Sequence, residues 1–148
     1  MKVLLLTDSL GNGGAERQLA LLAAGLPEPW RPRVCALGSG PFETHLRRQG
    51  IPVEVLVRRW RLDPLPAARL WRSIQAFSPD VVHAWGWISP LLAGPLCRLV
   101  GVPMIGSVRF GSLKGRHTRL GSLGMALATM VVANSHAGLQ GCAVAPAK

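Results

Sequence analysis

The chain has 148 residues, 49% of them hydrophobic, which is enough for one domain with a sizeable core and excludes a disordered tail. Lys and Arg number 17 against 7 for Asp and Glu, which gives a net charge of +10. Most of these cations are Arg in a chain also rich in Ala, Gly, Leu and Pro, so the charge alone does not establish an anionic partner.

Cysteine usage and apolar runs indicate the compartment. Cys35, Cys97 and Cys142 form neither a CxxC pair nor an even disulfide framework, which favours reduced thiols in a cytosol. The apolar run before Asp8 is shorter than the ~7 to 15 residues of a signal-peptide core. The longest apolar stretch, residues 120–133, falls short of the ~20 residues that span a bilayer. We therefore expect a cytoplasmic protein without a transmembrane helix, at most peripheral on the cytoplasmic membrane face.

Short apolar runs alternate with helical patterns along the whole chain. Strands are expected at residues 3–6, 33–37, 53–57, 81–84, 103–108 and 130–133. Helices are expected at residues 15–25, 41–50, 64–77, 90–101 and 120–129, with Asp63 and Ser89 as the N-caps of the third and fourth. This alternation predicts an α/β fold with a doubly wound, mainly parallel sheet and helices on both faces.

In such sheets ligands bind beyond the carboxyl ends of the strands, near the point where the strand order reverses. The segments that would meet there are residues 9–14, 38–40, 85–89, 109–115 and 134–136. Any chemistry is expected in these segments.

The first of them, "SLGNGGAERQL" at residues 9–19, carries three glycines between a strand and a helix. Bare backbone amides and the helix dipole at such a junction favour an anion, most often phosphate. A P-loop is excluded because the segment has no Lys or hydroxyl at the required offset. A dinucleotide site is disfavoured, because Glu16 occupies the third glycine position and no acidic residue ends the strand at 33–37. A nucleotide-dependent oxidoreductase is thus the least favoured alternative.

Three separate segments resemble the amino-terminal domain of family 4-like glycosyltransferases: "GNGGAERQLALLAAGL", "SPDVVHAWGWISPLLAGPLCRLVGVPMIGSVRF" and "VVANSHAGLQ". The resemblance covers residues 1–148. It implies one Rossmann-like half of a GT-B enzyme, in which two such domains face each other across a cleft. It also implies sugar transfer with retention of configuration from a nucleotide-sugar donor to a glycan or lipid-linked acceptor, with the nucleotide-sugar as co-substrate and no other cofactor.

The sequence departs from the family pattern in two places. The carboxyl-terminal half, which holds most of the donor in this family, does not appear within the 148 residues, so we expect this chain to need such a domain in cis or in trans. Many members also place a His after the fifth strand, close to the transferred sugar, where this chain has Arg109.

The resemblance and the strand-end rule together nominate candidate residues. Arg109 and His83 are the candidates for catalysis. Candidates for donor or acceptor binding are Gly13, Gly14, Glu16, Arg17, Trp85, Asn134 and Ser135.

Structural interpretations stay open beside each functional one. The glycines fit a tight turn, Glu16 fits a residue that complements the helix dipole, and Arg17 fits an exposed helix cation. His83, after two valines, fits a buried core residue better than a catalytic one. Trp85 and Trp87 alternate faces, so we expect one to pack inward and the other to line the cleft. No metal site is expected, because the His and Cys residues lack close ligand spacings.

A cluster of cations at Arg58, Arg59 and Arg61, joined by Arg69 and Arg72, suggests an anionic membrane surface as a partner. An ordinary solvated surface explains the same cluster equally well. The alternative from another class is a basic membrane-surface or nucleic-acid-binding module without catalysis. The sequence has no recognition motif for nucleic acid, which is therefore an unlikely partner.

Overall fold

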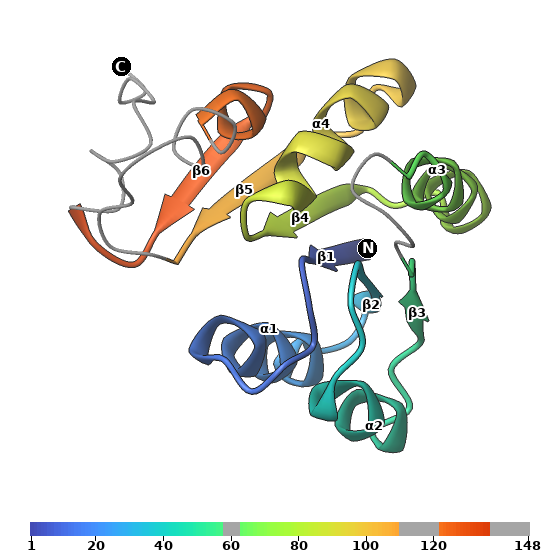
Figure 1. Cartoon of the computed structure of the whole chain (residues 1–148). Helices are drawn as coiled ribbons and strands as arrows, with labels where there is room; N and C mark the ends of the chain where they lie inside the picture. Colours follow the sequence, from blue (N-terminus) through green and yellow to red (C-terminus); the bar gives the residue numbers. More distant parts are fainter. Residues whose placement is uncertain (58–62, 110–121, 137–148) are drawn as a thin grey trace.

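The computed structural model describes residues 1–57, 63–109 and 122–136 (Figure 1). In these residues six strands form one parallel sheet with the order β3-β2-β1-β4-β5-β6. The strands are β1 (Lys2–Thr7), β2 (Arg31–Ala36), β3 (Val53–Val55), β4 (Val81–Trp85), β5 (Met104–Val108) and β6 (Met130–Ala133). This order reverses between β1 and β4, as in the doubly wound dinucleotide-binding fold.

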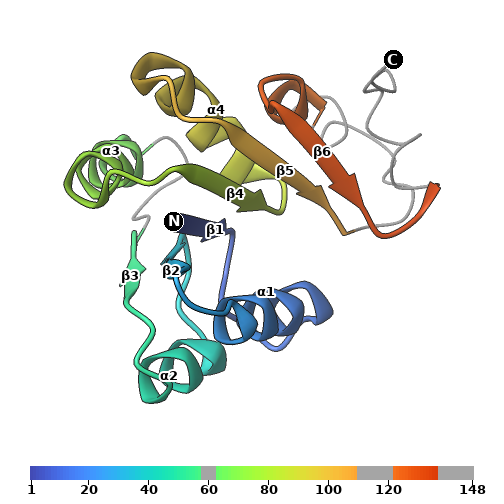
Figure 2. The ribbon, with the colours of Figure 1, turned by 180° about the vertical axis from the view of Figure 1, so that it is seen from behind.

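Helices cover both faces of the sheet. They are α1 (Gly14–Gly25), α2 (Pro41–Arg48), α3 (Leu65–Phe77) and α4 (Ile88–Val100), and residues 122–126 are also helical. α1 and α2 lie on one face of the sheet and α3 and α4 on the other, which the view from behind also shows (Figures 1 and 2). The expected α/β fold is confirmed.

The apolar run of β1 explains why this strand is central. Val3 and Leu5 point into the core beneath α1 and α2, whereas Leu4 and Leu6 point into the core beneath α3 and α4. Since both faces of β1 are covered, a continuous apolar run suits it better than an alternating one.

Two helix starts differ from the sequence prediction. Asp63 was expected to cap the helix that is now α3, but Pro64 occupies the cap position and Asp63 lies one residue earlier. Asp63 still accepts a hydrogen bond from the backbone N–H of Leu65 at 3.0 Å. Ser89 was expected to cap α4, but the helix begins at Ile88, so Ser89 lies inside its first turn. The physical reason is that the carboxylate of Asp8 caps α4 in place of the Ser89 hydroxyl.

The strand register places one row of residues across the carboxyl edge of the sheet. From β2 to β6 this row consists of Ala36, Thr7, Trp85, Ser107 and Val132. Because the strands are parallel and aligned, the loops that follow them leave from the same edge. The structure therefore brings together the expected ligand segments, as far as it describes them.

Candidate functional site

The carboxylate of Asp8, just after β1, fills the amino terminus of α4. It accepts hydrogen bonds from the backbone N–H groups of Trp87 (2.7 Å), Ile88 (3.2 Å) and Ser89 (2.8 Å), and from the Ser89 hydroxyl (2.6 Å). These groups would otherwise be free donors at the positive end of the helix dipole. Asp8 therefore caps α4 from 79 to 81 residues away in the sequence and closes this helix terminus to other anions.

Gly86 makes this contact possible. Its φ of +105° lies in a region that L side chains rarely adopt, and a Cβ at this position would overlap the Asp8 carboxylate. The backbone of the β4–α4 turn can thus pass directly over Asp8. This packing joins the loops that follow β1 and β4 at the point where the strand order reverses.

The amino terminus of α1 is arranged differently. Its N-cap is Gly13, which provides no side chain for a capping hydrogen bond, and Gly14 is its first residue. Both glycines are exposed, and a Cβ on Gly14 would meet no atom within 4 Å. Backbone amides at this terminus are therefore reachable from solvent, unlike those that Asp8 occupies at α4.

Glu16 holds the glycine loop together. Its Oε1 accepts a hydrogen bond from the Ser9 hydroxyl at 2.8 Å, and its carboxylate folds back against Gly13. Such a carboxylate in the first turn also complements the helix dipole. The structure thus provides a loop-stabilising role for Glu16.

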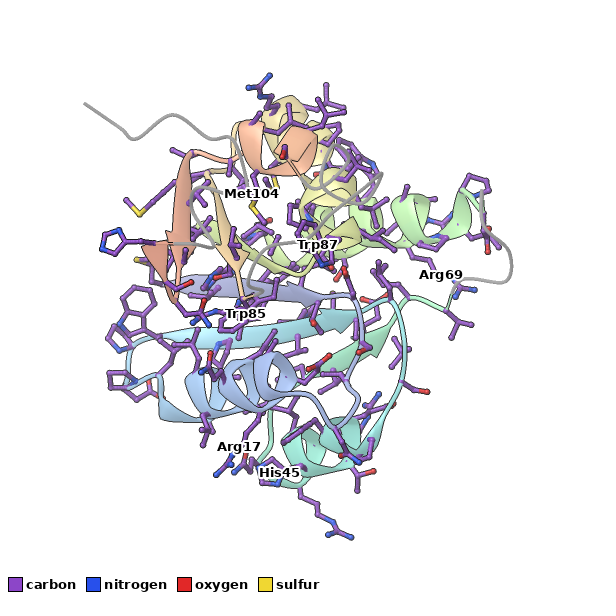
Figure 3. All side chains as sticks on the ribbon, turned by 60° about the vertical axis from the view of Figure 1, so that its left-hand side comes forward. Arg17, His45, Arg69, Trp85, Trp87 and Met104 are labelled. Atoms are coloured by element: carbon purple, nitrogen blue, oxygen red, sulfur yellow. The ribbon has the colours of Figure 1, made fainter. Side chains whose placement is uncertain are left out.

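Arg17 is not brought together with the other candidates. It is exposed on α1, and Figure 3 shows it well apart from Trp85. Its position matches the interpretation of an exposed helix cation.

His83 lies on β4, half-buried, on the face of the sheet that α1 covers. Its Nε2 lies 2.7 Å from the Ser107 hydroxyl of β5, and its ring centroid lies 5.0 Å from that of Trp85. Burial, followed by the positive charge of Arg109, lowers the pKa of His83 to about 4. The imidazole is therefore neutral at pH 7, with one ring nitrogen as a donor and the other as an acceptor.

Trp85 and Arg109 form a stacked pair at the ends of β4 and β5. The Arg109 Cζ lies 4.3 Å from the centroid of the Trp85 ring. Trp85 is only 2% exposed, so it is the tryptophan of the Trp85/Trp87 pair that packs inward, and Arg109 lies over its ring face. Trp87, the N-cap of α4, is half-buried. The structure therefore pairs Trp85 with a cation, where sequence analysis had considered a tryptophan lining the cleft.

Asn134 and Ser135 follow β6 and are both exposed. The backbone N–H of Asn134 donates to the Val108 carbonyl at 3.4 Å, which places it next to the end of β5. Arg69 and Arg72 lie on α3, whereas Arg58, Arg59 and Arg61 lie outside the described residues. The structure therefore describes only two of the five cations of the expected membrane surface, and the cluster stays a prediction.

The described residues contain no cluster of three or more metal-ligating side chains. Within the same residues, no helix combines the length and apolar character needed to cross a bilayer.

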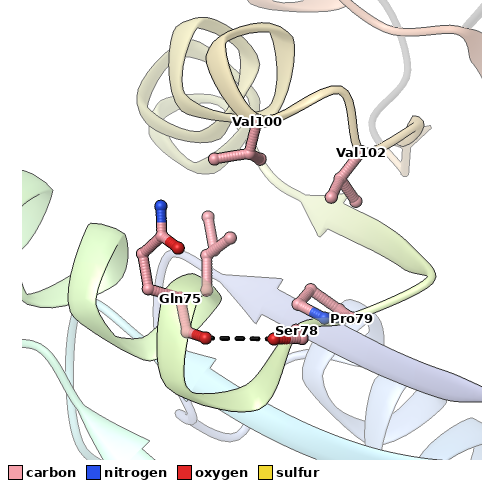
Figure 4. Close-up of a pocket in the computed structure, with 6 residues that line it drawn as sticks. Gln75, Ser78, Pro79, Val100 and Val102 are labelled. Atoms are coloured by element: carbon pink, nitrogen blue, oxygen red, sulfur yellow. Dashed lines mark hydrogen bonds between the residues drawn. The ribbon is translucent and has the colours of Figure 1, made fainter.

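A cavity of about 190 Å³ lies elsewhere, between the carboxyl-terminal ends of α3 and α4 (Figure 4). Its lining residues are Ile74, Gln75, Ser78, Pro79, Val100 and Val102. Because Pro79 and Val102 precede β4 and β5, the cavity lies at the opposite edge of the sheet from the strand-end segments. It contains no charged side chain and is not part of the candidate site.

Sequence reasoning missed three residues of the strand-end region: Asp8, Gly86 and Ser107. Asp8 directly follows an apolar strand, and α4 has no acidic residue in its own first turn, which is a weak signal that another carboxylate caps it. The partner of Ser107 depends on strand order, which no local pattern specifies.

Comparison with known proteins identifies the family. The sequence profile described as Glycosyltransferase Family 4 matches residues 12–140. The chain belongs to this family. No curated protein gives a significant sequence match.

Solved structures of other glycosyltransferases have the same fold. Anabaena Alr3699/HepE, solved in complex with UDP-glucose, matches with a TM-score of 0.82 at 25% identity over 96% of this chain. The lipopolysaccharide outer core galactosyltransferase WaaB, in its apo form, matches with a TM-score of 0.71 at 15% identity over 97%. Acinetobacter baumannii MurG matches with a TM-score of 0.67 at 18% identity over 89%. This family 4 chain therefore has the Rossmann-like half-domain fold of GT-B glycosyltransferases.

The matches cover only part of each solved protein. The chain spans 40% of HepE and of MurG, and 43% of WaaB. It therefore spans less than half of the length of each of these proteins.

Proposed function

We propose that this family 4 domain forms the acceptor-side half of a retaining glycosyltransferase. The enzyme would transfer a sugar, hexosyl in type, from a nucleotide-sugar to a glycan or lipid-linked acceptor and need no other cofactor. The donor would be held between this domain and a carboxyl-terminal donor domain, supplied in cis or in trans.

The contrast between two helix termini at one edge of the sheet carries this proposal. The α4 terminus is occupied by Asp8, whereas the α1 terminus has exposed glycines and no side-chain cap. An incoming phosphate would therefore meet exposed backbone at Gly13 and Gly14 of α1, where the Glu16 carboxylate is held by Ser9 and provides no cap. At α4, by contrast, the Asp8 carboxylate already accepts hydrogen bonds from the amides. HepE, which has the same fold, was solved with UDP-glucose bound, which agrees with a donor of this chemistry.

The other candidates have proposed roles around this point. Gly13 and Gly14 would let the donor phosphates approach the backbone of α1. Arg109 and the neutral His83 would contact the reacting groups, and Asn134 and Ser135 would border the site beyond β6. Glu16 and Trp85 would support the loop and Arg109, and Arg17 would act only at the outer margin.

Two domains are needed for physical reasons. Sugar transfer requires donor and acceptor to be held about 3 to 3.5 Å apart in a cleft that excludes water. One sheet edge provides a single wall of such a cleft. Moreover, no acidic residue ends β2 to bind a nucleotide ribose.

The test compares the 148-residue chain with the same chain joined to a matching carboxyl-terminal family 4 domain. Calorimetry should detect weak or no sugar-nucleotide binding by the chain alone, and assays with uridine, guanosine and adenosine diphosphate sugars should detect no transfer. Transfer should appear when the second domain is fused or added. Transfer by the chain alone would refute the two-domain account. Tighter, salt-sensitive binding to nucleic acid, with no transfer in either form, would favour the rival binding module.

A further inference from the structure

Within the part of the chain that the structure describes, the guanidinium of Arg109 forms no ion pair. The protein has seven acidic residues, all of them in the described part of the structure, and none forms an ion pair with Arg109. They are Asp8, Glu16, Glu28, Glu43, Glu54, Asp63 and Asp80. Asp8 accepts hydrogen bonds at the amino terminus of α4, and Glu16 accepts one from Ser9. Neither of these two carboxylates near the glycine loop pairs with Arg109.

Arg109 is nevertheless partly withdrawn from water. Its side chain is half-buried against the Trp85 ring, and its Nε is buried without a hydrogen-bond partner. The same desolvation lowers the pKa of Arg109. A desolvated cation without a partner costs free energy, and such groups concentrate at sites that bind or react.

Trp85 adds a second unpartnered donor to the same place. Its side chain is 2% exposed, yet its indole Nε1 has no hydrogen-bond partner. Buried indole N–H groups normally have an acceptor. Two adjacent, stacked side chains thus lack acceptors at the edge of the sheet where the strand-end loops meet.

Among the described neighbours of Arg109, His83 adds no competing charge. His83 is neutral at pH 7 and its Nε2 is engaged by Ser107, so it neither repels a cation nor supplies an anion. The pair Arg109 and Trp85 therefore combines a positive charge with two buried N–H groups, Arg109 Nε and Trp85 Nε1, that have no acceptor.

We propose that Arg109 and Trp85 form a subsite for an oxyanion, a phosphate or carboxylate, carried by the acceptor substrate. This inference rests on the proposed function. There the backbone amides of α1 bind the donor phosphates, so an anion bound by Arg109 would belong to the acceptor. The planar guanidinium fork matches the geometry of both oxyanions, and binding would supply the missing counter-charge. The acceptor class is thereby narrowed to molecules with a negative group close to the accepting hydroxyl.

The indole N–H of Trp85 offers a direct readout in the 148-residue chain. ¹H–¹⁵N spectra resolve tryptophan indoles, and a Trp85→Phe variant identifies the relevant signal. Titration with inorganic phosphate should move this signal downfield and saturate, because the N–H acquires an acceptor. Chloride at matched ionic strength should not produce a saturating shift.

Variants test whether Arg109 is responsible. Arg109→Gln should abolish the saturable shift, and Arg109→Lys should weaken the affinity about tenfold, because a point charge cannot reproduce bidentate binding. Arg98→Gln removes an exposed cation from the last turn of α4 and should leave the affinity unchanged. The dispersion of the remaining signals reports whether each variant is folded, and the Lys variant keeps the charge if the Gln variant is not folded.

The source of the anion is decided by comparing geranyl phosphate and glucuronate with UDP. Tighter binding of either acceptor-like anion through Arg109 supports the proposal. Tighter binding of UDP at this site overturns it. The proposal also fails if the unmodified chain shows no saturable indole shift, or if the shift persists in Arg109→Gln. Sugar transfer by the two-domain enzyme without this anion binding would refute the subsite alone. Anion binding without any transfer would refute the proposed function and keep the subsite.

Discussion

Asp8 and Gly86 lie in direct contact although they are far apart in the sequence. The Asp8 carboxylate occupies the space that a Cβ on Gly86 would fill, and it accepts hydrogen bonds from the turn that Gly86 begins. One pair thereby fixes the loops after β1 and β4 relative to each other. Because β1 and β4 flank the reversal of strand order, this pair also fixes the geometry of the candidate site.

Replacement of Gly86 by Ala should destabilise the domain by about 1–3 kcal/mol, because the new Cβ is strained at this φ and overlaps Asp8. Urea denaturation measures the change. Gly101→Ala is the matched control, since Gly101 has a φ of +71° but open space around its Cβ, and it should cost about 1 kcal/mol. Equal losses in the two variants would show that contact with Asp8 is unimportant.

Asp8→Asn should lower the free energy of unfolding by about 1–2 kcal/mol, since a neutral amide is a weaker acceptor at the positive end of α4. Glu43→Gln serves as control because it removes a carboxylate from an exposed ion pair with Arg47, worth about 0.3–0.5 kcal/mol. A denaturation midpoint for Asp8→Asn as high as that of Glu43→Gln would argue against a capping role.

His83 should make stability depend on pH. Its pKa of about 4 in the folded protein lies below the ordinary 6.5, so the unfolded chain binds the proton first. The stability from the neutral imidazole is complete above pH 6.5 and declines as the pH falls towards 4, by at most about 3 kcal/mol.

Urea denaturation between pH 7 and pH 4 should therefore show a smaller pH-dependent loss in His83→Gln than in the unmodified chain. His45→Gln, on the exposed side of α2, controls for loss of an imidazole. Identical slopes for His83→Gln and the unmodified chain would show that His83 titrates normally.

Gly14→Val should leave the domain folded but abolish transfer in the complete two-domain enzyme. A Cβ added at Gly14 meets no atom within 4 Å and the residue is exposed, so stability should change by less than about 1 kcal/mol. It would, however, occupy the space through which a ligand approaches α1. Gly25→Val, at the other end of the same helix and equally open, is the control for circular dichroism and turnover. Full turnover by Gly14→Val would eliminate the close-approach role.

Five cations should promote binding of the protein to anionic vesicles: Arg58, Arg59, Arg61, Arg69 and Arg72. Binding should weaken as salt rises past physiological strength, where the screening length is about 8 Å. Cosedimentation should fall more for Arg69→Gln/Arg72→Gln on α3 than for Arg47→Gln/Arg48→Gln on α2, which removes the same charge. Equal binding to neutral vesicles, or equal losses in the two double variants, would contradict a membrane-docking role for this cluster.

The sequence by itself determined the architecture. Runs such as residues 3–6 are apolar on both faces, and regular alternation with helical periodicity leaves a doubly wound parallel sheet as the solution that buries them. The glycines at residues 11, 13 and 14 likewise located one strand-end loop, because bare backbone at a strand–helix junction is a local signal. The candidates His83, Trp85 and Arg109 were found in the same way, from their positions at expected strand ends.

Only the tertiary structure decided which groups are partners. The carboxylate that caps α4 comes from Asp8, 81 residues before Ser89. A local sequence pattern therefore could not show that Asp8, and not Ser89, is the cap. The pairing of Trp85 with Arg109, and of His83 with Ser107, depends on β4 and β5 lying side by side. Burial then set the chemistry, because desolvation lowers the pKa values of His83 and Arg109, and desolvation depends on packing and not on residue type.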